Sequence, residues 1–131
     1  MSGYGRNEVY TYVVNALRAE YPGLDCTSRY VPKPSRFPSV YIHEIDHSRP
    51  AQYTQIDFDD VQWESAFEIQ VVSALANTAA SEAYAIMDVA RAAMNRLYYR
   101  EIQTAAVDEA TKFTVICRFR RVIGGGDTMP E

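Results

Sequence analysis

The sequence has 131 residues, of which 47% are hydrophobic and 23% are charged, the balance of a folded globular protein rather than a disordered chain. Its formal charge of -4, from 13 basic and 17 acidic side chains, argues against a general nucleic-acid-binding protein, which needs a surplus of Lys and Arg. No apolar run approaches the roughly 18 residues that span a bilayer, and the first residues lack the apolar stretch of a signal peptide. We therefore expect a cytoplasmic protein with no membrane contact.

The length suits one hydrophobic core, because single cores commonly form at roughly 100–200 residues. We expect residues 1–123 to form a single α+β domain with flexible residues 1–6 at its start. Residues 124–131 begin with three glycines and are expected to form a flexible tail.

The first predicted element is a helix at about 7–21. Apolar residues from Val9 to Leu17 recur every three or four positions, the spacing of an amphipathic helix. Asn7 fits the N-cap position, and Pro22-Gly23 supplies the stop.

The middle of the chain predicts strands separated by loops. A short strand is expected within 24–31, and prolines then predict an extended loop at 32–38. Alternating β-branched and aromatic residues predict strands at 38–46 and 63–75. The polar, acidic segment 51–62 between them is expected to be a long loop, which in small domains is often functional.

The last third predicts one helix and a pair of strands. Residues 78–97 carry a helical apolar stripe, with Asn77 and Thr78 as candidate N-caps. Strands follow at 100–107 and 111–122, joined by a turn. In the last strand, four residues are expected to face the core: Phe113, Val115, Cys117 and Phe119.

This element order predicts an α+β fold, a mainly antiparallel β-sheet with two helices packed on one face. Two helices can cover only one face of such a sheet, yet apolar side chains are also expected on the other face. These are Tyr41, Ile45, Val72 and Ile116. A partner subunit is one candidate for covering them.

Residues 43–47 read His-Glu-Ile-Asp-His and match the zinc-hydrolase pattern H-E-x-x-H, in which one helical turn brings both histidines onto one metal. The preceding Phe-Pro-Ser-Val-Tyr-Ile predicts a strand instead. In a regular strand His43 and His47 share a face about 13 Å apart, too far to bind one zinc ion, and Glu44 and Asp46 lie on the other face. We expect no catalytic, cofactor or metal site, and a zinc-dependent hydrolase using His43, Glu44 and His47 is a remote alternative.

The acidic loop and the cysteines also suggest simple interpretations. Asp57, Asp59 and Asp60 have no turn glycine between them, so a solvated acidic loop is expected rather than a calcium site. Cys26 and Cys117 match no CxxC spacing and are interpreted as buried thiols in a reducing compartment, with a disulfide as the alternative.

Arginines on the last predicted strand form the best candidate basic surface. Alternation points Arg118 and Arg120 to one side of the sheet. One interpretation is protection of a sheet edge or salt bridging to acidic partners. The other is contact with a neighbouring subunit, or with DNA passing close by.

Taken in order, these segments resemble the tail-terminator and minor-capsid (tail-completion) proteins of long-tailed bacteriophages over roughly 7–123. The resemblance rests on the N-terminal helix, on the 63–75 strand leading into the 78–97 helix, and on two strand sequences with their lead-ins. These are Phe37-Pro38-Ser39-Val40-Tyr41-Ile42, and Tyr99-Arg100 before Cys117-Arg118-Phe119-Arg120-Arg121-Val122.

The resemblance implies a structural virion protein rather than an enzyme. Such a tail terminator forms a homohexameric ring at the head-proximal end of the tail, stops polymerisation of the tail tube and provides the head-tail joining surface. The implied partners are further copies of the chain, the major tail tube protein and the head-completion or connector protein, with DNA passing through the lumen without sequence-specific binding. The implied location is the virion, after assembly in the host cytoplasm. A head-completion or neck adaptor protein is the alternative.

If the resemblance holds, the functional residues lie in interfaces. We expect subunit contacts from the strands at 38–46 and 111–122, through Tyr41, His43, Ile45, Ile116, Arg118 and Arg120. We expect the 51–62 loop to contact the tail tube or the neck, through Tyr53, Asp57, Phe58, Asp59 and Asp60.

Overall fold

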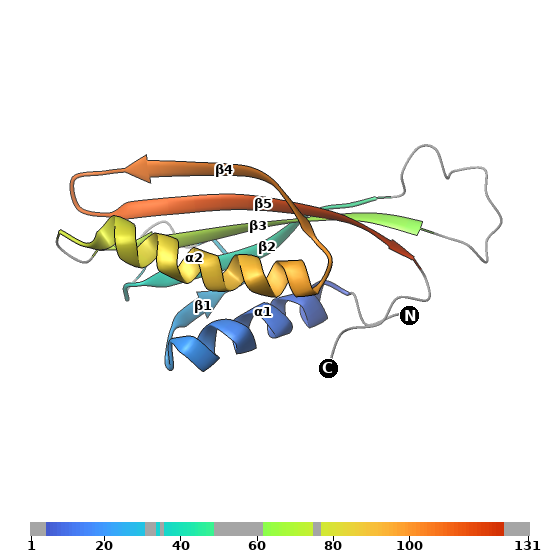
Figure 1. The fold of residues 1–131 in the computed structure, drawn as a ribbon, viewed down its shortest axis with the longest axis horizontal. Helices are drawn as coiled ribbons and strands as arrows, with labels where there is room; N and C mark the ends of the chain where they lie inside the picture. Colours follow the sequence, from blue (N-terminus) through green and yellow to red (C-terminus); the bar gives the residue numbers. More distant parts are fainter. Residues whose placement is uncertain (1–4, 31–33, 35, 49–61, 75–76, 125–131) are drawn as a thin grey trace.

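The structure is a computed structural model that describes residues 5–30, 34, 36–48, 62–74 and 77–124. Its elements follow the predicted order (Figure 1): α1 (Arg6–Glu20), β1 (Asp25–Thr27), β2 (Ser39–Ser48), β3 (Gln62–Ser73), α2 (Ala79–Arg96), β4 (Arg100–Asp108) and β5 (Phe113–Gly124). β1 is shorter than expected, and β5 continues to Gly124, where the flexible tail was expected to begin. Within the described residues, no helix is both long and apolar enough to cross a membrane.

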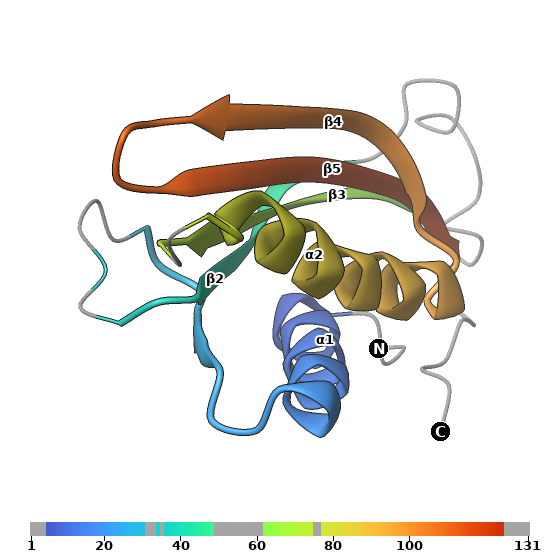
Figure 2. The same ribbon diagram turned by 60° about the vertical axis from the view of Figure 1, so that its left-hand side comes forward.

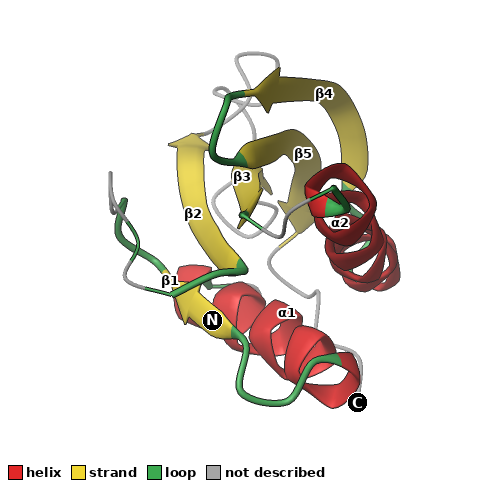
Figure 3. Cartoon of the chain, turned by 90° about the vertical axis from the view of Figure 1, so that its left-hand side faces the viewer, coloured by secondary structure: helices red, strands yellow, loops and turns green. Residues whose placement is uncertain are grey.

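One sheet contains all five strands in the order β1-β2-β3-β5-β4. β1 runs parallel to β2, and the other neighbours are antiparallel. Figures 2 and 3 show both helices on the same side of the curved sheet, with β4 as an outermost strand. The prediction of a mainly antiparallel sheet with two helices on one face is confirmed.

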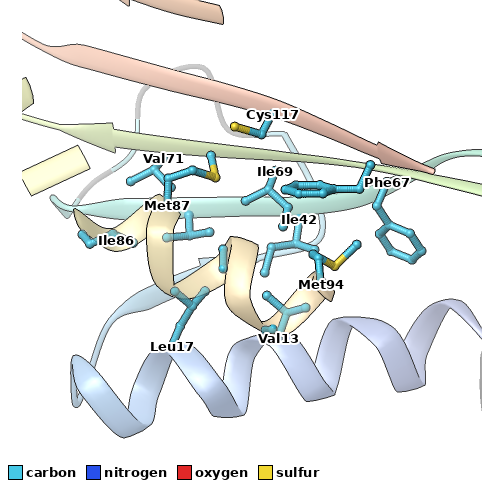
Figure 4. Packing of buried hydrophobic residues seen from close by; sticks show 14 of the residues in the cluster. Val13, Leu17, Ile42, Phe67, Ile69, Val71, Ile86, Met87, Met94 and Cys117 are labelled. Carbon is cyan, nitrogen blue, oxygen red and sulfur yellow. The ribbon is translucent and has the colours of Figure 1, made fainter. Parts of the chain in front are cut away.

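The core lies between the helices and the sheet (Figure 4). The apolar stripe predicted for α2 is fully buried: Ala83, Ile86, Met87, Ala90, Met94 and Leu97. Facing residues from α1 and the three central strands complete the core, including Val9, Val13, Leu17, Ile42, Phe67, Ile69, Val71, Val115, Cys117 and Phe119. The helical period of 3.6 and the strand period of 2 therefore identified the buried positions correctly.

The N-cap of α1 lies two residues before the predicted one. Gly5, not Asn7, occupies the N-cap position in an extended conformation, and its carbonyl accepts a hydrogen bond from the backbone N–H of Val9 at 3.1 Å. The Asn7 prediction is therefore wrong. It relied on side-chain preference, whereas a glycine can start a helix with its backbone alone. The predicted stop is confirmed, because α1 ends before Gly23, which has a φ of 79°.

α2 ends in a Schellman motif built on a tyrosine. The backbone N–H of Tyr98 donates to the carbonyl of Asn95 at 2.9 Å, and that of Tyr99 donates to Met94 at 2.9 Å. This closure needs a left-handed residue, and Tyr98 adopts a φ of 64°. The ring of Tyr98 is 75% exposed and lies 5.4 Å from the guanidinium carbon of Arg121. The motif therefore stores backbone strain that glycine would not have.

We expect Tyr98→Gly to be more stable than Tyr98→Ala by about 1 kcal/mol, because both variants lose the ring and only alanine keeps the left-handed strain. The measurement is urea denaturation of the two variants followed by circular dichroism. Equal stabilities would show that the left-handed conformation carries no strain at this site.

Candidate assembly surface

The sheet face turned away from the helices, here called the open face, carries most of the predicted interface residues. Strand register pairs Gln70 of β3 with Tyr41 on one side and Ile116 on the other. It pairs Glu68 with His43 and Arg118 in the same way. Directly paired residues point to the same side of a sheet, and the alternate residues of these strands are in the core. The open face therefore brings together Tyr41, His43, Ile116, Arg118 and Arg120 from two strands separated by β3.

A row of charged side chains crosses the open face at one level. The Nε of Arg118 donates to Oε2 of Glu68 at 2.8 Å, and the Nε2 of Gln70 donates to Oε1 of Glu68 at 2.8 Å. On the other side, Nε2 of His43 lies 3.7 Å from Oε1 of Glu68. The Glu68 side chain is only 10% exposed, whereas that of Arg118 is 47% exposed. Arg118, Gln70 and His43 therefore enclose the carboxylate of Glu68.

Burial by itself would raise the pKa of Glu68, but the hydrogen bonds from Gln70 and Arg118 and the charges of His43 and Arg118 lower the pKa below its ordinary value. For His43, burial lowers the pKa, and Arg118 adds to the effect while Glu68 opposes it. Its Nδ1 is buried and has no hydrogen-bond partner among the described residues. His43 therefore favours the neutral state, and Glu68 favours the charged one.

Aromatic rings cover the same end of the open face. The ring of Tyr41 stacks on His43 with centroids 4.2 Å apart and an interplanar angle of 9°, and Tyr30 packs against Tyr41 at 5.8 Å. Stacking of this kind orients side chains without fully burying them. The predicted residues Tyr41 and His43 thus form one ordered, half-buried unit.

The first interpretation of the arginines offered edge protection or salt bridging, and the structure rejects edge protection and supports salt bridging. β5 lies between β3 and β4, so it is not an edge strand. Arg118 pairs with Glu68, and Nη1 of Arg120 donates to Oε1 of Glu64 at 2.7 Å. Both arginines lie on the open face, as alternation predicted. A partner approaching this face would meet paired rather than isolated positive charges.

The His-Glu-Ile-Asp-His segment lies on β2, which confirms the predicted strand. However, a register shift between Glu44 and Asp46 forms a β-bulge at Ile45. Asp46 then pairs with Ala66 on the open face, and His47 pairs with Ser65 on the helix side. The prediction that His43 and His47 share one face, with Glu44 and Asp46 on the other, is therefore wrong. The extra residue reverses the alternation beyond it.

The bulge creates a small polar cluster on the helix side of the sheet. Oε2 of Glu44 accepts a hydrogen bond from Oγ of Ser65 at 3.0 Å and lies 3.2 Å from Nδ1 of His47. The Ser65 hydroxyl also lies 2.8 Å from the Tyr99 hydroxyl. Ser65 is fully buried. The cluster therefore ties together neighbouring strands and the end of α2, and it does not present an accessible nucleophile.

The H-E-x-x-H pattern requires a helix to bring its histidines together, and residues 43–47 lie in a strand. Among the described residues, no group of three or more His, Cys, Asp and Glu side chains is placed to hold a metal ion. Cys26 is partly exposed and Cys117 is buried, and both are free thiols. Burial raises the pKa of Cys26 to about 11.

The structure adds two open sheet edges that the sequence interpretation missed. All nine residues of β4 are exposed, and the only described strand beside it is β5. On the opposite side, β1 pairs with β2 only from Ser39 to Tyr41. The signal for the β4 edge was present in the sequence, since residues 100–108 lack the repeating large apolar residues of 113–119.

The remaining predicted residues have different outcomes. Ile45 is 40% exposed and is the residue of β2 left unpaired at the bulge. The predicted contact loop, with Tyr53, Asp57, Phe58, Asp59 and Asp60, lies outside the described residues.

No family model and no curated protein matches this sequence. Among solved structures, the chain is similar to one described as "Virion of native gene transfer agent (GTA) particle". The match has a TM-score of 0.53 and 16% identity, and it covers 89% of this chain and 92% of the other. The protein therefore shares its fold, along nearly the whole length of both chains, with a chain from that particle.

Proposed function

We propose that the protein is a structural subunit of a phage-type virion, and within that class a tail terminator. The observation that carries the proposal is the fold shared with a chain of the gene transfer agent virion over most of both chains. The order of elements and the strand sequences noted above support the same class independently, because they were identified from the sequence alone.

In this proposal the protein forms a homohexameric ring at the head-proximal end of the tail, stops polymerisation of the tail tube and provides the surface that joins the head. A closed ring needs two different patches on each subunit, one for each neighbour. The open face and the two open edges supply surfaces of this kind. We propose Tyr41, His43, Ile116, Arg118 and Arg120 on the open face, and Ile45 at the bulge, as subunit contacts.

The second candidate is a head-completion or neck adaptor protein. It would share the ring and the surfaces, but it would bind the connector on the head side rather than the tail tube. An enzymatic role has less support, since Ser65 is buried and the zinc pattern lies on a strand.

We expect the purified protein to have the mass of a hexamer in light scattering or native mass spectrometry, alone or with tail tube protein from the same particle. In electron micrographs, adding the protein to polymerising tube protein should give shorter tubes with a ring at one end. A ring that binds only the connector would favour the neck adaptor. A strict monomer that leaves tube length unchanged would rule out the terminator.

A further inference from the structure

β4 is an edge strand with no side chain in the core. Each of its nine residues is exposed, and its backbone pairs along one side with β5. On the helix side, Nε of Arg91 in α2 holds β4 against the helix by donating a hydrogen bond to Oε2 of Glu101 at 2.9 Å. The N–H and C=O groups on its outer side have no described strand beside them. Such an edge is a template for another extended strand.

The β4 edge also lacks the residues that normally prevent pairing. Residues 102–107 read Ile-Gln-Thr-Ala-Ala-Val, with no charge and no proline. The register with β5 is regular from Gln103 to Asp108, and the bulge at Ile102 interrupts only the start of the strand. The side chains of Ile102 and Val107 are 49% and 43% exposed. Edge strands of this length usually carry lysine, proline or a central bulge, unless another strand pairs with them.

A second open edge lies on the opposite side of the same sheet. Beyond Tyr41, residues 42–48 of β2 have no described strand on their outer side. A groove of about 580 Å³ runs beside the start of this stretch. The N-terminal turns of α1 and the residues after β1 form its outer wall, with Arg6, Asn7, Tyr10, Ser28 and Arg29 among its lining residues. The groove leaves room for an added chain against β2.

The two edges also run in matching directions. β2, β3, β5 and β4 are successively antiparallel, so β4 is antiparallel to β2 within one subunit. Rotating a second subunit about an axis parallel to the strands does not change the direction of its strands. Its β4 can then lie beside β2 of the first subunit, and the two strands are antiparallel. Antiparallel pairing has the better hydrogen-bond geometry. The β4 edge of one subunit would join the β2 edge of the next, so a pair of subunits still has one free β4 edge and one free β2 edge. Further subunits can therefore add through the same contact.

We infer that β4 of each subunit pairs with residues 42–48 on β2 of the next, so that one sheet continues from subunit to subunit. The inference rests on the proposed ring and specifies how its neighbours are joined. It commits to a second copy of this chain as the partner, because this chain itself supplies a complementary open edge. A two-fold β4–β4 contact and a strand from a different protein are the competing outcomes.

The test is cross-linking between two proteins that each carry one introduced, accessible cysteine, both made in the full chain with Cys26→Ser. The β4 protein carries Ala105→Cys or, as a second register, Gln103→Cys; the β2 protein carries Ile45→Cys. The two are co-expressed with different tags and treated with a short bis-maleimide, whose arm covers the roughly 7–8 Å between diagonal cross-strand neighbours. The buried Cys117 is retained.

We expect a cross-linked heterodimer in the mixture and no cross-linked product from either protein alone. Asn95→Cys, on the exposed side of α2, replaces Ile45→Cys as the matched control and should give none. A product from the β4 protein alone would show a two-fold β4–β4 contact and overturn the inference.

The mass of each assembly separates this inference from the proposed function. A ring that gives no heterodimer with either β4 cysteine would overturn the strand pairing and leave the terminator proposal standing. A heterodimer in an open chain of subunits would support the pairing and contradict the ring. A monomer would overturn both.

Discussion

Replacing Phe67 by alanine is expected to lower the free energy of unfolding by about 3–5 kcal/mol, the usual cost of removing a large aromatic side chain from a packed core. Phe67 is 1% exposed and projects from β3 into the space between the sheet and the helices (Figure 4). Its ring meets that of Tyr99 edge-on, with centroids 5.7 Å apart and an angle of 90°. The variant therefore loses buried apolar area and an aromatic contact and leaves a cavity.

Urea denaturation followed by circular dichroism measures this loss. The matched control is Val122→Ala on β5, whose parent side chain is 46% exposed, and we expect it to cost less than about 1 kcal/mol. If the two variants were equally stable, the core would not be packed as described.

Replacing Glu68 by glutamine is expected to cost about 1.5 kcal/mol, the lower end for a hydrogen bond to a charged group. The carboxylate is nearly buried and accepts from both Arg118 and Gln70, so the amide removes a charge that these donors stabilise. The value is at the low end because Arg118 is about half exposed and water screens its charge. Glu64→Gln is the control, because Glu64 also pairs with an arginine but its side chain is more exposed, at 23%. We expect this substitution to lower the free energy of unfolding by less than about 1 kcal/mol.

The effect of Glu68→Gln should also depend on pH. The folded protein lowers the pKa of Glu68 below its ordinary value of 4.5, so the unfolded chain binds the proton more readily. The stabilisation by this carboxylate is therefore complete above pH 4.5 and is lost as the pH falls through the lowered pKa of the folded state. The difference between parent and variant should shrink over that range. A constant difference would place the cost in packing rather than in charge.

Much of the fold is local information, which explains why the sequence predicted it. The stripe from Ala83 to Leu97 has the helical period, and the alternation from Phe113 to Phe119 has the strand period. Each pattern states which side of its element must be buried, so fold class, element order and most of the core followed from it. Strand alternation also placed Tyr41, His43, Arg118 and Arg120 on one face.

The bulge at Ile45 could not be predicted in this way. A bulge is a mismatch between two strands, and the residue left unpaired depends on how β3 lies against β2. The alternation within β2 contains no sign of it. As a result, the sequence correctly placed residues 43–47 in a strand but gave the wrong side for His47 and Asp46.

The sequence by itself therefore determined what each segment is and which side it buries, including that His-Glu-Ile-Asp-His belongs to a strand. Only the tertiary structure decided which strands are neighbours, that β5 lies inside the sheet and β4 at its edge, and that Glu68 is enclosed between His43 and Arg118. The physical reason is that strand order and register arise from hydrogen bonds between segments far apart in the chain, whereas periodicity records only each segment's own burial.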